Sequence, residues 1–220
     1  MFTSSTWALR IFGISGILGA MCLICGDLLY NHVPGSSSSK ATKMGNLPES
    51  RLHNAGTLGL VGCWFYTLAA LHLYLAFQPA GPIFAFMLSI AFGAVMVGYG
   101  IGHTAYFSIA TGAHVAVRFG SDADQGAKLG RAFFRRIVHM IYIPAAISSL
   151  MMFYGIVAER SFYPRWMIVF LPVIVYLLKS PVIRITTGRV RELLNDSYDN
   201  VALFIFFIIS TLVLWNSVVF

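Results

Sequence analysis

The sequence predicts an all-α protein, a polytopic transmembrane bundle of about six membrane-spanning helices. Two observations lead to this prediction. Of the 220 residues, 58% are hydrophobic and only 10% are charged, whereas a soluble domain averages about 25% charged residues. The apolar residues also gather in long runs, and a helix needs about 20 of them to cross a bilayer. The whole chain, residues 1–220, is therefore expected to form a single integral membrane domain.

Six apolar runs account for the expected helices. They extend from about Trp7 to Tyr30, Asn54 to Phe77, Ile83 to Ala110, Ile137 to Val157, Trp166 to Ile183 and Val201 to Val219. The turn QPAGP, residues 78–82, separates the second run from the third, which can extend beyond Ala110. The fifth run has the shortest strictly apolar stretch and contains Pro172 and Pro181. Because its strictly apolar stretch is so short, this run is the weakest of the six expected spans.

Three polar loops, residues 31–53, 111–136 and 184–200, separate these runs and set the expected orientation. Residues 31–53 contain the Ser-rich linker PGSSSSKATK, and residues 184–200 are expected to form a short amphipathic interfacial helix. With six spans, twelve Lys and Arg residues fall on one side: Lys40, Lys43, Arg51, Arg118, Lys128, Arg131, Arg135, Arg136, Lys179, Arg184, Arg189 and Arg191. Three fall on the other side: Arg10, Arg160 and Arg165. The positive-inside rule predicts that both termini are non-cytoplasmic, in a bacterial inner membrane or its equivalent.

The net charge of +7 indicates a membrane partner. Basic residues beside apolar runs meet anionic lipid headgroups, so we expect the lipid bilayer as the partner and no nucleic acid. Small residues recur at helical spacing, as in Gly16 and Ala20, Ala55 and Gly59, and Ala94, Gly98 and Gly102. Such faces let helices approach closely. These small-residue faces can be explained by packing within one bundle, and an oligomer that uses them is also possible.

Asp27 is the most informative polar residue, because it lies inside the first apolar run. Placing an aspartate at the membrane centre costs about 2.5–3.5 kcal/mol on insertion scales. With six spans, the depths of the helices bring Asp27, His53, His103, His139 and Asp199 to the same boundary, each from a different helix. His72 is expected in the other half. The sequence therefore predicts a polar pocket near the cytoplasmic boundary.

The chemistry of these side chains suggests their roles. A carboxylate beside a histidine forms a general acid–base unit. The candidate catalytic residues are Asp27, His103, His139 and Tyr106. The candidate substrate-binding residues are His53, Asn54, Arg51, Arg135, Arg136 and Asp199. Each of these residues also has a structural interpretation, since Asp27 can pair with an arginine and the surface histidines can lie at the interface.

Metal and redox chemistry have weaker support in the sequence. No His-x-x-x-His pair or Cys–His pair is present, so we assign no metal residues and leave the cofactor unknown. Cys22 and Cys25 have the spacing of a redox motif, but they lie inside the first apolar run. Buried cysteine commonly behaves as a small hydrophobic residue. A packing role is therefore favoured for this pair.

Three functions remain open at this stage. The first is an enzyme that uses acid–base chemistry on a lipid-like or terpenoid substrate, a hydrophobic small molecule. The second is a proton-coupled transporter of a small molecule, and the third is a non-catalytic membrane assembly partner. The outer halves of the spans carry almost no charge, which favours a pocket open on one side over a path through the protein.

The stretch GDLLYNH after the first apolar run, followed by HNAGTLGLVGCWFY and LHLYLAF, provides one resemblance. This first third of the chain resembles small uncharacterised multi-pass bacterial membrane proteins with a Gly-Asp-Leu-Leu-Tyr stretch. The resemblance implies a helical bundle and brings no activity with it. In size and in its intramembrane acid, the chain also resembles the small transmembrane terpene cyclases, although no residue can be carried over from them.

Overall fold

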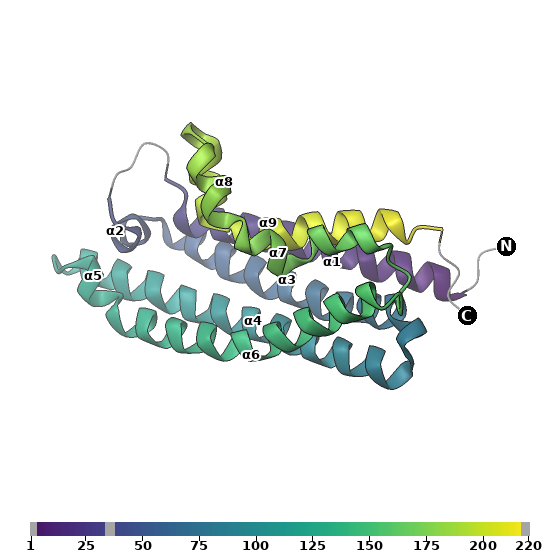
Figure 1. Ribbon diagram of the computed structural model, residues 1–220. Helices are drawn as coiled ribbons and strands as arrows, with labels where there is room; N and C mark the ends of the chain where they lie inside the picture. The colour runs from purple at the N-terminus through teal and green to yellow at the C-terminus, as the bar shows by residue number, and fades with distance from the viewer. Residues whose placement is uncertain (1–3, 34–37, 217–220) are drawn as a thin grey trace.

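The computed structural model describes residues 4–33 and 38–216, and every regular element within them is a helix (Figure 1). The long helices are α1 (Ser4–Asn31), α3 (Glu49–Ala76), α4 (Pro82–Arg118), α6 (Lys128–Val157) and α9 (Gly188–Val213). The short ones are α2 (Lys40–Gly45), η1 (Gln78–Ala80), α5 (Ala123–Gly126), η2 (Arg165–Phe170), α7 (Pro172–Leu177) and α8 (Lys179–Ile185). Five of these helices are long and apolar enough to cross a membrane. The predicted all-α helical bundle is confirmed.

The expected fifth span forms a chain of short helices. Leu171 adopts an extended conformation before Pro172, which begins α7. Proline favours an extended conformation in the residue before it, and Leu171 adopts one, so the helix is interrupted at this point. The segments η2, α7 and α8 nevertheless run from the end of α6 to the start of α9, back along the bundle (Figure 1). The chain thus makes five long passes and one broken pass.

Several helix ends differ from the expected boundaries. Helix α4 continues past Ala110 to Arg118, and α6 begins at Lys128 rather than at Ile137. The expected amphipathic segment before the last span is continuous with it in α9, with a kink at Ser197. Gly81, in the turn before α4, has a φ of 99°, which favours glycine. The linker residues 34–37 and the end of the sixth expected span, residues 217–219, lie outside the described residues.

The helices pack in a consistent order. Helix α1 lies between α3 and α9, α3 also packs on α4, and α4 packs on α6. The segments η2 and α7 pack on α9. One set of helices, α4 and α6, therefore faces another, α7 and α9, and α1 and α3 join the two sets. This arrangement leaves room between α6 and α7.

Two ends of the bundle can be distinguished. The basic end holds α2, α5 and α8, while α1 begins and α9 ends at the opposite end (Figure 1). At the basic end, Ser39 donates a hydrogen bond to Asp124 at 2.8 Å, and Arg131 forms an ion pair with the same carboxylate. The hydrogen bonds from Arg131 and Ser39 hold the pKa of Asp124 below its usual value. This contribution to stability is present above the ordinary aspartate pKa and is lost as the pH falls through the lowered one.

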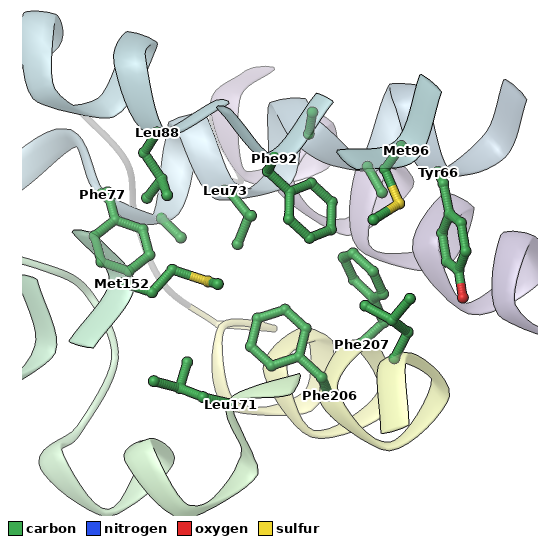
Figure 2. Packing of buried hydrophobic residues seen from close by; sticks show 14 of the residues in the cluster. Tyr66, Leu73, Phe77, Leu88, Phe92, Met96, Met152, Leu171, Phe206 and Phe207 are labelled. Carbon is green, nitrogen blue, oxygen red and sulfur yellow. The ribbon is translucent and has the colours of Figure 1, made fainter. Parts of the chain in front are cut away.

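The main hydrophobic core lies towards the opposite end and is rich in aromatic rings (Figure 2). Phe206 and Phe207 of α9 are fully buried, and their rings lie 5.2 Å apart. A Cβ added to Gly16 would overlap the ring of Phe207, and one added to Gly19 would come within 2.7 Å of Tyr66. Small residues on α1 thus admit these rings. The small-residue face of α1 is used in packing within one chain.

Candidate functional site

A cavity of about 660 Å³ lies between α4 and α6 on one side and α7 and α9 on the other. This volume is in the range of sites for small organic ligands. Most of its wall is apolar, formed by Phe92, Val95, Met96, Ile141, Ala145, Met152, Val173 and Leu203, among others. Its polar residues come from the parts of the helices towards the basic end. The cavity therefore has an apolar part and a polar part, as a site for an amphiphile requires.

Asp27 lies at the polar part of the cavity, in the last two turns of α1. Its carboxylate accepts a hydrogen bond of 2.7 Å from the Nδ2 of Asn200, on α9. The other carboxylate oxygen lies 3.9 Å from the Nε2 of His103, on α4. The side chain of Asp27 is 18% exposed. Three separate helices thus bring a carboxyl, an amide and an imidazole together at one point.

His103 owes its position to a glycine on the neighbouring helix. A Cβ on Gly59 of α3 would lie 2.7 Å from both the Cγ and the Nδ1 of His103. The absence of a side chain at Gly59 therefore lets the imidazole lie against α3. The Nδ1 atom has no hydrogen-bond partner among the described residues, and the side chain is only 10% exposed. The imidazole is held by packing, with its Nε2 directed towards Asp27.

Replacing Gly59 with alanine is expected to displace His103 and to lower the free energy of unfolding by about 1–3 kcal/mol, because overpacking of a filled interior carries this cost. Gly93→Ala in α4 is the matched control, since its new Cβ would meet only the Cβ of Ala70, at 3.9 Å. The control is expected to be neutral. Reversible unfolding of both variants in mixed micelles measures the difference, and equal stabilities would contradict the prediction.

Tyrosine rings surround this polar part. Tyr106, one turn after His103, donates a weak hydrogen bond of 3.4 Å to Asn31, and its ring packs edge-on against Phe134. Tyr99 lies one turn before His103 and also lines the cavity. Tyr142 of α6 and Tyr176 of α7 line it from facing helices and are exposed. These two exposed residues mark a lateral opening of the cavity between α6 and α7.

Two ion pairs complete the polar part. Lys40 of α2 lies 3.1 Å from Asp196, and Lys179 of α8 lies 3.0 Å from Asp199. All four residues line the cavity. Each lysine is therefore already neutralised by a carboxylate of α9. Among the described residues, no group of three or more His, Cys, Asp and Glu side chains has the arrangement needed to hold a metal ion.

A model of a family of unknown function, DUF6796, matches residues 1–217. The chain belongs to this family. No curated protein and no solved structure matches the chain. Membership thus brings no activity with it, and the function has to be argued from the site. The resemblance to proteins with a Gly-Asp-Leu-Leu-Tyr stretch stays a prediction.

The structure brings four of the predicted site residues to the cavity of this family member. Asp27, His103, Tyr106 and Asp199 all line it. The others lie outside its lining: His53, Asn54, Arg51, Arg135, Arg136 and His139. Of these, His53, Asn54, Arg135, Arg136 and His139 are exposed, and His53 stacks on Phe107. They do not face the cavity, because a position along a helix does not determine which way its side chain points.

Sequence reasoning also left out residues that the cavity uses. Asn200, the hydrogen-bond donor to Asp27, follows Asp199 directly, and its position at the start of an apolar run was the available signal. Lys40, Lys179 and Asp196 belong to segments interpreted as loops or helix ends. Their meeting depends on α2 packing on α4 and on α8 lying beside the start of α9, which no local pattern predicts.

Arg51 has a structural position. Its guanidinium donates hydrogen bonds to the backbone carbonyls of Leu28, Leu29 and His32, at 3.1, 2.8 and 2.6 Å. The last carbonyls of a helix have no partner within the helix. Arg51 supplies partners for this end of α1. It thereby fixes the last turn of α1, just beyond Asp27.

Arg51→Gln is expected to lower the free energy of unfolding by about 2–3 kcal/mol, since hydrogen bonds from a charged donor contribute about 1.5–3 kcal/mol. The matched control is Arg118→Gln, which breaks an exposed ion pair of 3.0 Å with Glu49. Exposed pairs contribute about 0–1 kcal/mol. Unfolding in mixed micelles compares the two variants. A larger loss for Arg118→Gln would show that the cap at α1 matters little.

A second buried polar cluster lies in the other half of the bundle, where His72 was expected. The Nδ1 of His72 lies 2.9 Å from the carbonyl oxygen of Leu9, and its Nε2 lies 2.5 Å from the hydroxyl of Ser210. The hydroxyl of Tyr163 lies 2.7 Å from the same Ser210 oxygen. A carbonyl can only accept, so Nδ1 carries the proton, Ser210 donates to Nε2, and Tyr163 donates to Ser210. This relay links α1, α3, α9 and the segment before η2.

Proposed function

We propose that this protein is an integral membrane enzyme that performs acid–base chemistry on a lipid-like or terpenoid molecule. The supporting observation is the pair of Asp27 and His103, 3.9 Å apart, at the polar part of an otherwise apolar cavity. An aspartate inside a spanning helix is costly unless it serves a purpose. Here it faces a cavity and an imidazole rather than an arginine.

The geometry supports proton transfer to or from a bound molecule. The 3.9 Å separation between Asp27 and His103 is too long for a direct hydrogen bond, so a polar group of the substrate can bind beside both side chains. His103 accepts a proton from that group, and Asp27 stabilises the imidazolium that forms. Asn200 holds the carboxylate of Asp27 in place through its 2.7 Å hydrogen bond.

The shape of the cavity supports an amphiphilic substrate. The apolar wall offers Phe92, Met96, Met152 and other side chains to a hydrocarbon tail. Exposed cavity residues of α6 and α7, Tyr142 and Tyr176, mark an entrance from the side of the bundle, where lipid would surround the protein. A molecule that enters there can place its tail against the apolar wall and its polar group at Asp27. Ligand pockets of this kind combine a mostly apolar lining with a few placed polar groups.

A carrier is less well supported than an enzyme. Transport would require a path from the cavity to the opposite end of the bundle. Phe77, Leu73, Phe206 and Phe207, all fully buried, pack across this region (Figure 2). The fully buried imidazole of His72 packs against the ring of Phe207 and does not line the cavity. The polar groups therefore form two separate clusters rather than one route.

The orientation of the protein follows from its basic end. The twelve Lys and Arg residues named above belong to the loops and helix ends gathered at that end. Under the positive-inside rule, the basic end faces the cytoplasm and both termini face the other side. The reaction would then take place near the cytoplasmic boundary of the membrane.

A conversion screen tests the proposed function. Purified full-length protein in lipid nanodiscs is incubated with lipid and isoprenoid extracts, and products are followed by mass spectrometry. We expect a product that appears with the wild type and is lost with Asp27→Asn. Glu192→Gln, which also removes one carboxylate but at an exposed position, is the control. No difference between wild type and Asp27→Asn across the extracts would overturn the proposal and favour an assembly partner.

A further inference from the structure

The charges of the cavity are unevenly compensated. Lys40 and Lys179 are each paired with a carboxylate of α9, as described above. Asp27 has no Lys or Arg within ion-pair distance among the described residues, and its nearest basic group is His103. Charge that is taken out of water needs a partner of the opposite sign. Among the described residues, Asp27 therefore has only an imidazole and an amide as polar neighbours, which favours a cationic ligand beside it.

The polar part also holds a buried hydrogen-bond acceptor without a donor. Asn200 is 3% exposed, and while its Nδ2 donates to Asp27, its Oδ1 has no donor in the described structure. The Asp27 oxygen that faces His103 has no hydrogen-bond donor within bonding distance either. Buried acceptors of this kind normally have a partner. The buried oxygen of Asn200, together with the partly exposed Asp27 carboxylate beside it, favours a ligand that carries several N–H donors.

The aromatic lining suits the same ligand. Tyr99 and Tyr106 flank His103, and aromatic rings attract cations through their faces. At the edge of the cavity, an ammonium group already lies beside a carboxylate and tyrosine rings. The ammonium of Lys179 pairs with Asp199 and lies 5.8 Å from the ring centres of both Tyr176 and Tyr198. Carboxylates and tyrosine rings thus surround one ammonium at the rim, and the same groups recur around Asp27.

We propose that the cavity binds an amphiphile whose head is an ammonium group, with Asp27 and the Asn200 carbonyl as its acceptors and the apolar wall around its tail. This inference rests on the proposed function only in taking the cavity as the substrate site. It deepens that function by naming the head group. An anionic phosphate head is disfavoured because both lysines of the cavity are already paired and Asp27 would repel it.

Photoaffinity labelling tests the head group. Two probes carry the same diazirine-bearing hexadecyl tail, one with a primary ammonium head and one with a phosphate head. The full-length protein in phosphatidylcholine nanodiscs is labelled with each probe, and labelled peptides of α4, α6 and α9 are quantified. We expect the ammonium probe to label these cavity peptides about tenfold more than the phosphate probe, which corresponds to about 1.4 kcal/mol. Equal labelling, or stronger labelling by the phosphate probe, would overturn the inference.

Variants separate cavity binding from attraction to the surface. Asp27→Asn is expected to remove the preference, whereas Asp27→Glu keeps the carboxylate and is expected to retain it. Glu192→Gln changes the net charge by the same amount as Asp27→Asn at an exposed site outside the cavity and is expected to retain it too. A preference that persists in Asp27→Asn would contradict the assignment of Asp27. If that variant does not fold, competition with unlabelled hexadecylamine and hexadecyl phosphate on the wild type decides the question.

The labelling experiment is independent of turnover. A protein that binds the ammonium probe through Asp27 but converts no lipid would support the head group and contradict the enzyme. A protein that converts a lipid but shows no preference for the ammonium probe would support the enzyme and contradict the ammonium head group. The two proposals can therefore fail separately.

Discussion

His103→Gln and Asp27→Asn are each expected to lower the rate of the proposed conversion by about 10²–10⁴-fold, the range typical of general acid–base catalysis. The double variant is expected to be no slower than the slower single variant. The reason is that the two side chains, 3.9 Å apart, act as one unit, and the loss of either disables both. Rates measured in nanodiscs at saturating substrate give this double-mutant cycle.

Two exposed residues provide controls for this cycle. His139→Gln changes a histidine near the same boundary, and Glu192→Gln changes an acid, both outside the cavity. Neither is expected to alter the rate by more than about twofold, since surface changes seldom propagate. Additive losses in the cycle would mean that Asp27 and His103 act independently. An unchanged rate in either single variant would remove that residue from the chemistry.

His72→Leu is expected to lower the free energy of unfolding by about 2–4 kcal/mol. The substitution removes both hydrogen bonds of the imidazole and leaves the hydroxyl of Ser210 without its acceptor in a fully buried position. A buried polar group without a partner costs about 1–3 kcal/mol, and the lost bonds add to that. The unfolding transition in mixed micelles measures the change.

The same variant separates the two polar clusters. His139→Leu, at an exposed position, is the control and is expected to leave stability within about 0.5 kcal/mol of the wild type. The preference of His72→Leu for the ammonium probe should match that of the wild type, because His72, Ser210 and Tyr163 do not line the cavity. A changed preference would show that the clusters communicate. A stability equal to the wild type would mean that the relay from Tyr163 to Leu9 carries little energy.

Much of the fold could be predicted from composition and local patterns. The apolar runs marked the long helices, and QPAGP marked the turn before α4, where Gly81 has its positive φ. The ends were less accurate, as α4 continues to Arg118 and α6 begins at Lys128. Polar residues can continue a helix beyond the membrane, so hydropathy alone does not locate its end. The fifth run was expected to be the weakest span because its apolar stretch is short, but the extended Leu171 that breaks the pass before Pro172 is visible only in the structure.

For the candidate site, the sequence predicted how far along each helix the residues lie, but not which way their side chains point. Asp27 and His103 were expected at the same level, and the structure places them 3.9 Å apart. His139 was expected there too, yet it is exposed while its neighbour Val138 lines the cavity. One residue along a helix is a rotation of about 100°, which is enough to turn a side chain from the cavity to the outside.

The sequence by itself determined that the chain forms apolar helices, that they traverse the bundle in alternating directions, and that Asp27 and His103 lie near the same end of it. These properties follow from composition and spacing along the chain. Only the tertiary structure decided which of those side chains meet. The packing of α1 against α3 and α9, the space that Gly59 leaves for His103, and the amide of Asn200 beside Asp27 depend on contacts between distant segments. Helix rotation is set by those contacts, because side chains pack into one another closely and a displaced ring would leave a void or an overlap.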